Sequence, residues 1–219
     1  MTGRNPAELS GLAPQDLVDL MRRNLSVPRT APEELRIGPF SSVIGARIRH
    51  LFPASLRPAA VLVPIVDRPQ GPTVLLTYRA PDLKHHGGQI SFPGGGLEPG
   101  DDNPETCALR ETEEEIGLGR GFVEILGRLP DHLVITGYQV TPVVGLVQPG
   151  FELRLDPTEV ADSFEAPLHH LFDIRTHTRV LRQFGQFELE AFDLPWRGHN
   201  IWGATAGMLL TLREILLEG

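Results

Sequence analysis

The sequence is poor in cysteine and contains no long apolar run. Its 219 residues include a single cysteine, Cys107, which excludes an internal disulfide. No stretch reaches the roughly 18 apolar residues that a membrane-spanning helix needs. The first residues also lack the apolar core of a secretion signal. These absences lead us to expect a cytoplasmic protein that has no membrane partner.

Positive charge is also in the minority. The chain has 20 Lys and Arg against 28 Asp and Glu, which gives a formal net charge of −8 at pH 7. Proteins that bind nucleic acids present a basic surface, so we do not expect a nucleic-acid partner. An anionic small molecule would have to meet a local cluster of cations or a metal ion.

The order of predicted elements places strands around one central helix. That helix is expected over Pro104–Ile116, with Asn103 as its N-cap and Gly117 as its C-terminal stop. A glycine-dense loop, 85–104, leads into it. Further predicted elements are strands at 59–66, 73–79, 123–129, 139–147 and 159–164, a hairpin of 177–184 and 186–192, and a C-terminal helix over 204–218. The order predicts a mixed α/β sandwich.

Length and composition predict one folded domain. Hydrophobic residues make up 41% of the chain and charged residues 22%, as in ordinary globular proteins. We expect residues 1–219 to form a single domain, in which residues 1 to about 58 are an N-terminal helical extension. The one helix predicted there is amphipathic and runs from Pro14 to about Asn24.

Four glutamates crowd the C-terminal end of the central helix, in RETEEEIG (110–117). Each carboxylate there opposes the helix dipole, at a cost of about 0.3–1 kcal/mol. Glu111, Glu114 and Glu115 share one face of the helix, whereas Glu113 points away. A divalent cation such as Mg²⁺ would offset both the dipole and the repulsion among the carboxylates. The alternative is a solvated acidic face.

The glycines upstream favour a site over a solvated face. FPGG (92–95) and the next glycine leave backbone groups open to a metal or a phosphate. From Gly96 to Leu118 the sequence G-LEPGD-D-NPETCAL-RETEEEIGL resembles the Nudix box, G-x5-E-x7-R-E-U-x-E-E-x-G-U, where U is bulky and apolar. Two positions differ, with Asp102 in place of the first Glu and Thr112 in place of the first U. Counting from one residue earlier puts Asp101 in the acidic position instead.

The resemblance implies an α/β/α sandwich with a mixed sheet, and an enzyme that uses Mg²⁺ or Mn²⁺ to hydrolyse a nucleoside diphosphate linked to another moiety. It implies that Glu111, Glu114 and Glu115 ligate the metal, together with the backbone of Gly95. Arg110 matches the arginine that orients a box glutamate. Metal ions suit this chemistry because they neutralise the pyrophosphate and acidify a bound water.

A second stretch narrows the substrate. LLTYRAPDLKHHGGQISFPGG (75–95) is similar to the signature of the coenzyme A pyrophosphatase branch, L-L-T-x-R-[SA]-x3-R-x3-G-x3-F-P-G-G, with Lys84 in place of the second arginine. Arg79, Lys84, His85 and His86 form a cationic patch that suits the extra 3′-phosphate of coenzyme A. The alternative is that Arg79 closes a strand-end ion pair and that the histidines are ordinary loop residues.

Two further segments resemble the same branch. LDPTEVADSF carries Glu159, and branch members have a similar N/D-P-x-E-V segment, so the resemblance implies an acid outside the box that binds metal or acts as a base. The alternative is a surface glutamate. IWGATA (201–206) resembles the branch's C-terminal sequence, and we interpret it as packing of the last helix.

Three other functions remain as alternatives. The first is a Nudix enzyme for another nucleoside diphosphate derivative, such as ADP-ribose or a dinucleotide. The second is a catalytically inactive Nudix-fold binding module, which the intact R-E-x-x-E-E disfavours. The third is a calcium-binding structural domain, which is disfavoured because no D-x-[DN]-x-[DN]-G loop is present.

Overall fold

The computed structural model describes residues 9, 11–26, 53, 55–83, 86–134, 136–184 and 187–218. Its main sheet contains β1 (Arg57–Val66), β2 (Thr73–Arg79), β3 (Ile90–Ser91), β4 (Gly94–Gly96), β5 (Val123–Arg128), β6 (His132–Val134), β7 (Tyr138–Val147) and β8 (Val160–Pro167). The strand order is β3-β2-β1-β7-β5, with β4 paired to β1, β6 to β7 and β8 to β2. β1 and β7 are parallel and the other pairs are antiparallel, so the expected mixed sheet is confirmed.

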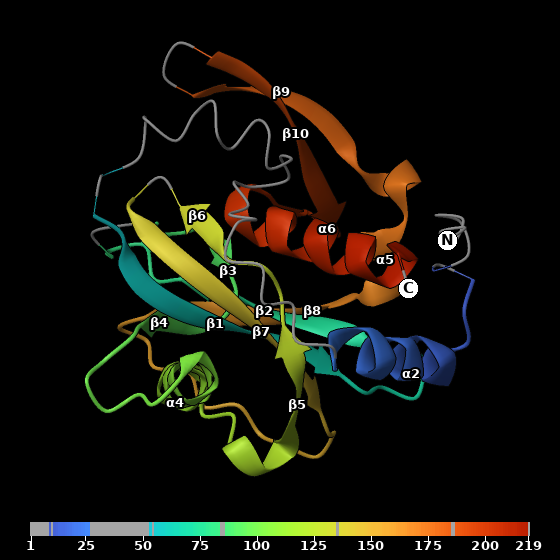
Figure 1. Cartoon of the computed structure of the whole chain (residues 1–219), viewed down its shortest axis with the longest axis horizontal. Coiled ribbons are helices and arrows are strands. Elements are labelled where there is room, and N and C mark those ends of the chain that lie inside the picture. The colour runs from blue at the N-terminus through green and yellow to red at the C-terminus, as the bar shows by residue number, and fades with distance from the viewer. Residues whose placement is uncertain are drawn as a thin grey trace.

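Helices cover both faces of this sheet (Figure 1). They are α2 (Pro14–Leu25), α4 (Pro104–Ile116), α5 (Leu168–Phe172) and α6 (Gly203–Glu218), with 3-10 turns η2 (Arg120–Phe122) and η3 (Ile174–Thr176). Figure 1 shows α4 on one side of the sheet and α2 and α6 on the other, which confirms the α/β/α sandwich. None of the helices in the described ranges combines the length and the apolar character needed to cross a bilayer.

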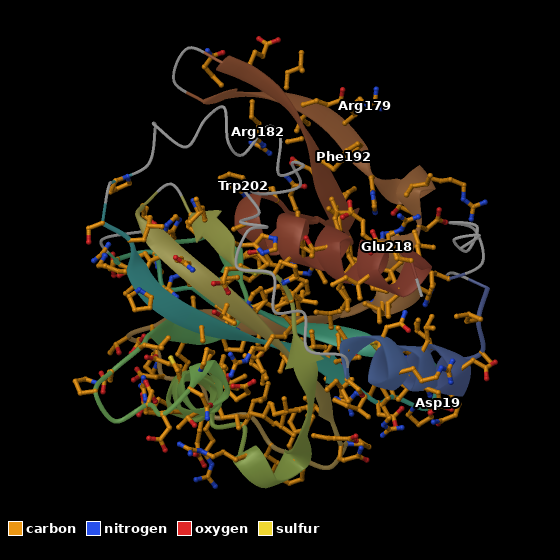
Figure 2. The ribbon with its side chains drawn as sticks, in the orientation of Figure 1. Asp19, Arg179, Arg182, Phe192, Trp202 and Glu218 are labelled. Carbon is orange, nitrogen blue, oxygen red and sulfur yellow. The ribbon has the colours of Figure 1, made fainter. Side chains whose placement is uncertain are left out.

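A second sheet of three strands stands beside α6 (Figure 1). It has the order β11-β10-β9, formed by β9 (Thr178–Phe184), β10 (Phe187–Trp196) and β11 (His199–Ile201). The side chain of Arg182 extends from β9 toward the start of α6 (Figure 2), where its guanidinium lies 4.6 Å from the ring centroid of Trp202. Trp202 therefore packs at the junction of hairpin and helix, in agreement with the interpretation of IWGATA.

The core explains why β1 is almost wholly apolar. Ala60 and Leu62 pack into the hydrophobic cluster on the α4 side, whereas Val63 and Ile65 join the larger cluster on the side of α2 and α6. A strand that is buried on both faces carries a continuous apolar run instead of an alternating one. β1 thus forms the centre of the sheet, and the acidic helix α4 lies across it.

The glycine-dense segment before α4 differs from the expectation of a loop, because it contains β3 and β4. Gly94 makes this possible. It has a φ of +151°, and a Cβ on it would lie 2.6 Å from the Cα of Val61 on β1. Only a glycine allows backbone to approach that closely. β6, α5 and β11 were also not predicted, since elements of three to five residues are too short to show a periodic pattern.

Candidate active site

The ends of α4 agree with the prediction from sequence. The side chain of Asn103 accepts a hydrogen bond from the Thr106 N–H at 2.9 Å, Pro104 occupies the first turn, and Gly117 has a φ of +68°. These local signals set which helical face each glutamate occupies. Glu113 lies on the outside and pairs with Arg120, while Glu111 and Glu115 turn toward β4. Glu114 is exposed and contacts Arg110.

Arg110 holds the first acids together. Its guanidinium donates to both carboxylate oxygens of Asp101, at 3.2 and 2.8 Å. Its Nη1 also donates to Glu111 Oε1 and Glu114 Oε2, each at 3.0 Å, and Nη2 reaches the carbonyl of Gly96 at 3.3 Å. One arginine therefore positions two box glutamates and the backbone of β4.

Of the two candidate aspartates, Asp101 is the one that contacts Arg110. The side chain of Asp101 is only 2% exposed, whereas Asp102 is exposed. The hydrogen bonds from Arg110, with help from the backbone N–H of Glu98, lower the pKa of Asp101 to about 2. Asp101 therefore stays ionised and acts as the anchor of Arg110.

Glu111 lies directly against the backbone of Gly95. A Cβ placed on Gly95 would be 2.5 Å from Glu111 Oε1, so a side chain there would displace the carboxylate. Burial raises the pKa of Glu111, and the neighbouring charges of Glu114 and Glu159 raise it further, although Arg110 opposes both effects. The negative charge of this carboxylate is thus only partly balanced.

Glu115 is buried, which argues against the alternative of a solvated acidic face at this position. Its side chain is 2% exposed, and Oε2 accepts a hydrogen bond from the Gly94 N–H at 3.0 Å. The guanidinium of Arg79 lies 3.6 Å from Oε1. Burial raises the pKa of Glu115 to about 7 despite these two partners, because desolvation disfavours the charged carboxylate.

The segment after β7 brings Glu159 to the acidic cluster. Two of its N–H groups, from Arg154 and Asp156, donate to the C-terminal carbonyls of α4 at Ile116 and Glu115, at 2.8 and 2.9 Å. The carbonyl of Glu159 then accepts a hydrogen bond from the Ala80 N–H at 2.8 Å, at the end of β2. Glu159 thereby lies close enough to raise the pKa of both Glu111 and Glu115.

The residues predicted for substrate recognition occupy different places. Arg79 ends β2 and faces Glu115. Both ring nitrogens of His86 have partners, since Nδ1 lies 2.8 Å from Gln89 Oε1 and Nε2 lies 3.1 Å from Thr136 Oγ1. His86 therefore fastens its loop to the turn between β6 and β7. Lys84 and His85 lie outside the described residues.

The oxygen atoms of this site fit a divalent cation in chemistry, and arginines are the present partners of these carboxylates. The described ranges contain no three His, Cys, Asp or Glu side chains already arranged to hold one metal ion. Arg110 instead holds Glu111 and Glu114, and Arg79 faces Glu115. Several carboxylates with unbalanced charge are the donor set that hard cations prefer.

Two contacts at the site had no signal in the sequence. The thiol of Cys107 lies under β4, 3.7 Å from the carbonyl of Gly95 and 3.5 Å from that of Gly96. Burial raises the pKa of this thiol to about 11, so it remains neutral. The second contact is that of Thr136 with His86, which are 50 positions apart and meet only in the folded chain. Cys107 occupies a box position at which the pattern allows any residue, and Thr136 lies outside both motifs.

Comparison with known proteins agrees with this geometry. The model of the NUDIX domain matches residues 56–184. The uncharacterized Nudix hydrolase NudL of Shigella flexneri serotype 5b (strain 8401) is 41% identical over 168 residues, which cover 76% of this chain and 84% of the relative. The protein of the same name from Yersinia pestis (strain Pestoides F) is 40% identical over 166 residues, covering 75% and 82%.

Solved structures include one similar fold from M. smegmatis, the Nudix hydrolase RenU. It has a TM-score of 0.46 and 24% identity, over 54% of this chain and 75% of that one. The family match covers more than half of the chain, and the NudL sequences align over three quarters of it. The chain therefore belongs to the Nudix family. It is a pyrophosphohydrolase, and enzymes of this family use divalent metal ions and act on small nucleotides.

Proposed function

We propose that this enzyme hydrolyses the pyrophosphate of coenzyme A and its derivatives to adenosine 3′,5′-diphosphate and 4′-phosphopantetheine, with Mg²⁺ or Mn²⁺. The observation that supports it is the position of the coenzyme A-type stretch, 75–95. Its first strand ends with Arg79 facing Glu115, and its last glycines lie against Glu115 and Glu111. The recognition stretch and the acidic cluster thus form one site.

We propose two roles for the box residues: some ligate the cation, and Arg110 orients the ligands. We assign Glu111, Glu114 and Glu115, with the carbonyl of Gly95, to the cation. The bound cation supplies charge neutralisation for the pyrophosphate and a water of lowered pKa. Arg110 orients Glu111 and Glu114 through the hydrogen bonds that it already makes.

Glu159 is the acid outside the box. Its backbone is fastened to Ala80, and its carboxylate lies within electrostatic range of Glu111 and Glu115. From that position it would take the proton from the attacking water or add an oxygen to the metal site. Both roles require the close approach that the segment after β7 provides.

Recognition of the 3′-phosphate falls to the loop between β2 and β3. Arg79 faces a box glutamate, so we place its guanidinium at the cleavage end of the substrate instead of at the 3′-phosphate. His86 already has partners on both ring nitrogens, so its contribution is to brace the loop. Lys84 and His85 remain the candidates for the 3′-phosphate.

The decisive test compares coenzyme A with dephospho-coenzyme A, which lacks the 3′-phosphate. Lys84→Ala should lower kcat/KM for coenzyme A by about 10- to 150-fold, as expected for a lost hydrogen bond to a charged group, and leave dephospho-coenzyme A almost unchanged. Lys84→Arg restores the residue of the branch signature and should retain activity. Equal losses on both substrates would remove Lys84 from 3′-phosphate recognition.

Chemical labelling gives an independent measurement because Lys84 is the only lysine in the chain. Coenzyme A should protect Lys84 from an amine-reactive reagent, as followed by peptide mapping, whereas dephospho-coenzyme A should protect it less. Faster hydrolysis of ADP-ribose or of a dinucleotide than of coenzyme A would contradict the substrate assignment and leave the family assignment intact.

A further inference from the structure

Arg79 connects the recognition loop to the acidic cluster. Its backbone N–H donates to the carbonyl of Gln89, and its carbonyl accepts from the Gly88 N–H, each at 3.0 Å. Arg79, which precedes the loop, is thereby hydrogen-bonded to the residues at the far end of the loop. Its side chain is 23% exposed and reaches toward Glu115, with 3.6 Å between Nη1 and Oε1. One residue thus contacts both parts of the site.

A β-bulge directs the Arg79 side chain to this place. Tyr78 is opposite Asp162 on β8, but Arg79 is opposite Val160, so Ala161 is the extra residue. Bulges change the direction in which nearby side chains point. Tyr78 extends from the other face of β2, where its hydroxyl lies 2.8 Å from His199 Nδ1. That contact holds the strand end in place beneath Arg79.

The buried carboxylate of Glu115 requires a positive charge beside it. A buried carboxylate is costly unless a positive charge or hydrogen bonds compensate it. The Gly94 N–H serves Oε2 and leaves Oε1 facing the guanidinium of Arg79. The guanidinium of Arg79 and a metal ion bound by Glu115 would therefore compete for the same carboxylate.

We propose that Arg79 is the internal counter-ion of Glu115 and competes with the catalytic cation for it. In the metal-free enzyme Arg79 balances the buried carboxylate. When the cation is bound, the guanidinium is released to meet the anionic substrate beside the loop that Arg79 closes. Metal binding and substrate binding are therefore coupled through this one residue, because Arg79 is free to contact the substrate only when the cation is bound. The inference rests on the proposed function only in taking Glu115 as a metal ligand.

The test measures Mn²⁺ affinity from the electron paramagnetic resonance signal of the free ion, with no substrate present. Arg79→Gln should bind Mn²⁺ about 5- to 30-fold more tightly, because a competing positive charge is gone, and should turn over more slowly. Arg79→Lys keeps the charge and should bind Mn²⁺ like the wild type. A purely structural role would instead weaken both metal affinity and turnover.

Arg68→Gln is the matched control. Arg68 also pairs with a glutamate, Glu165 on β8, through hydrogen bonds of 3.1 and 2.5 Å, and neither residue belongs to the acidic cluster. Its removal should leave Mn²⁺ affinity unchanged. Unchanged or weaker Mn²⁺ binding by Arg79→Gln would overturn the proposal, and so would equal tightening by Arg68→Gln.

A measurement on the wild type covers the case in which Arg79→Gln fails to fold. The Nε–Hε resonance of Arg79, assigned by its loss in Arg79→Lys, should shift as Mg²⁺ alone is added. No shift at saturating Mg²⁺ would overturn the proposal. Since neither measurement contains coenzyme A, an enzyme that prefers another nucleotide would defeat the substrate assignment without affecting this result.

Discussion

Individual acids of the site lie in unequal surroundings. Hydrogen bonds from Arg110 keep the pKa of Asp101 at about 2, so this aspartate is a permanent anion. Burial acts in the opposite direction on Glu111, whose pKa is raised, and on Glu115, whose pKa reaches about 7. The site therefore combines one well-compensated acid with two that resist ionisation, which is the condition that favours binding of a cation.

The free energy of unfolding of Glu115→Gln tests whether burial raises the pKa of Glu115. Because the pKa of Glu115 is about 7 in the folded chain and 4.5 as a reference, the folded state binds more protons between these values. The contribution of Glu115 to the free energy of unfolding is therefore greatest below pH 4.5 and is lost as the pH rises to about 7. In EDTA, the free energy of unfolding of Glu115→Gln should match that of the wild type at pH 4 and exceed it by about 3 kcal/mol at pH 8.

Chemical denaturation at the two pH values measures this difference, and a difference that does not vary with pH would contradict the burial argument. The same variant should lose most turnover at saturating Mg²⁺, since Gln lacks the charge that holds a hard cation. Activity near that of the wild type would show that Glu115 is not a ligand.

Glu159→Gln should lower kcat by about 10²-fold or more if this residue takes the proton from water. The substitution preserves shape, and the backbone bond from Ala80 to the carbonyl of residue 159 remains. A pH–rate profile distinguishes the two roles, because loss of a base removes one limb of the profile, whereas loss of a ligand raises the Mg²⁺ requirement. A change of less than threefold at every pH and Mg²⁺ concentration would exclude Glu159 from the mechanism.

At the scale of elements, the site depends on how closely β4 approaches α4. β4 pairs with β1 through Gly94, Gly95 and Gly96 and carries no side chains, so the Glu111 carboxylate rests on bare backbone. The segment after β7 then closes the far end of α4 by donating to its last carbonyls. The dipole penalty of the glutamates is therefore reduced locally, since those carbonyls are no longer unpaired.

Gly95→Ala and Gly96→Ala form a matched pair for this arrangement. A Cβ on Gly95 would lie 2.5 Å from Glu111 Oε1, whereas a Cβ on Gly96 meets nothing within 4 Å. Gly95→Ala should therefore lower kcat by on the order of 10²-fold, because a misplaced catalytic group costs about that much. Gly96→Ala should stay close to the wild type in steady-state kinetics. Equal activity of the two variants would show that the Glu111 carboxylate can move without loss.

At the scale of the whole molecule, we propose that α2 belongs to the same folded unit as the rest of the chain. Met21 is fully buried in the cluster that also contains residues of α6 and β1. Arg22 pairs with Glu124 on β5 at 2.8 Å, and Asn24 donates to the carbonyl of Ile215 on α6 at 3.1 Å. These contacts connect the N-terminal helix to both the sheet and the last helix.

Met21→Ala tests whether residues 1–219 behave as one domain. Loss of this buried side chain should reduce the free energy of unfolding by about 2–5 kcal/mol, with one cooperative transition by circular dichroism and by fluorescence. Arg23→Ala, at an exposed position of the same helix, should change it by less than about 0.5 kcal/mol. A separate early transition in Met21→Ala would show that the extension folds independently.

The bounds of α4 and the face on which each glutamate lies could be predicted because their causes are local. Asn103, Pro104 and Gly117 act within one turn of the helix ends, and helical spacing places the glutamates. The long strands were predictable for a similar reason, since burial leaves apolar runs such as 59–66. The family could be recognised because its box is also one continuous segment.

Only the tertiary structure decided how the site is completed. It selected Asp101 over Asp102, buried Glu115 and joined it to Arg79, 36 positions earlier in the chain. It also brought Glu159 to the end of α4 and made a strand of the glycines in β4. These contacts join residues that are distant in the chain, and they depend on strand pairing and on the route of the segment after β7. No local propensity encodes such a distance, because it follows from the packing of the whole sheet.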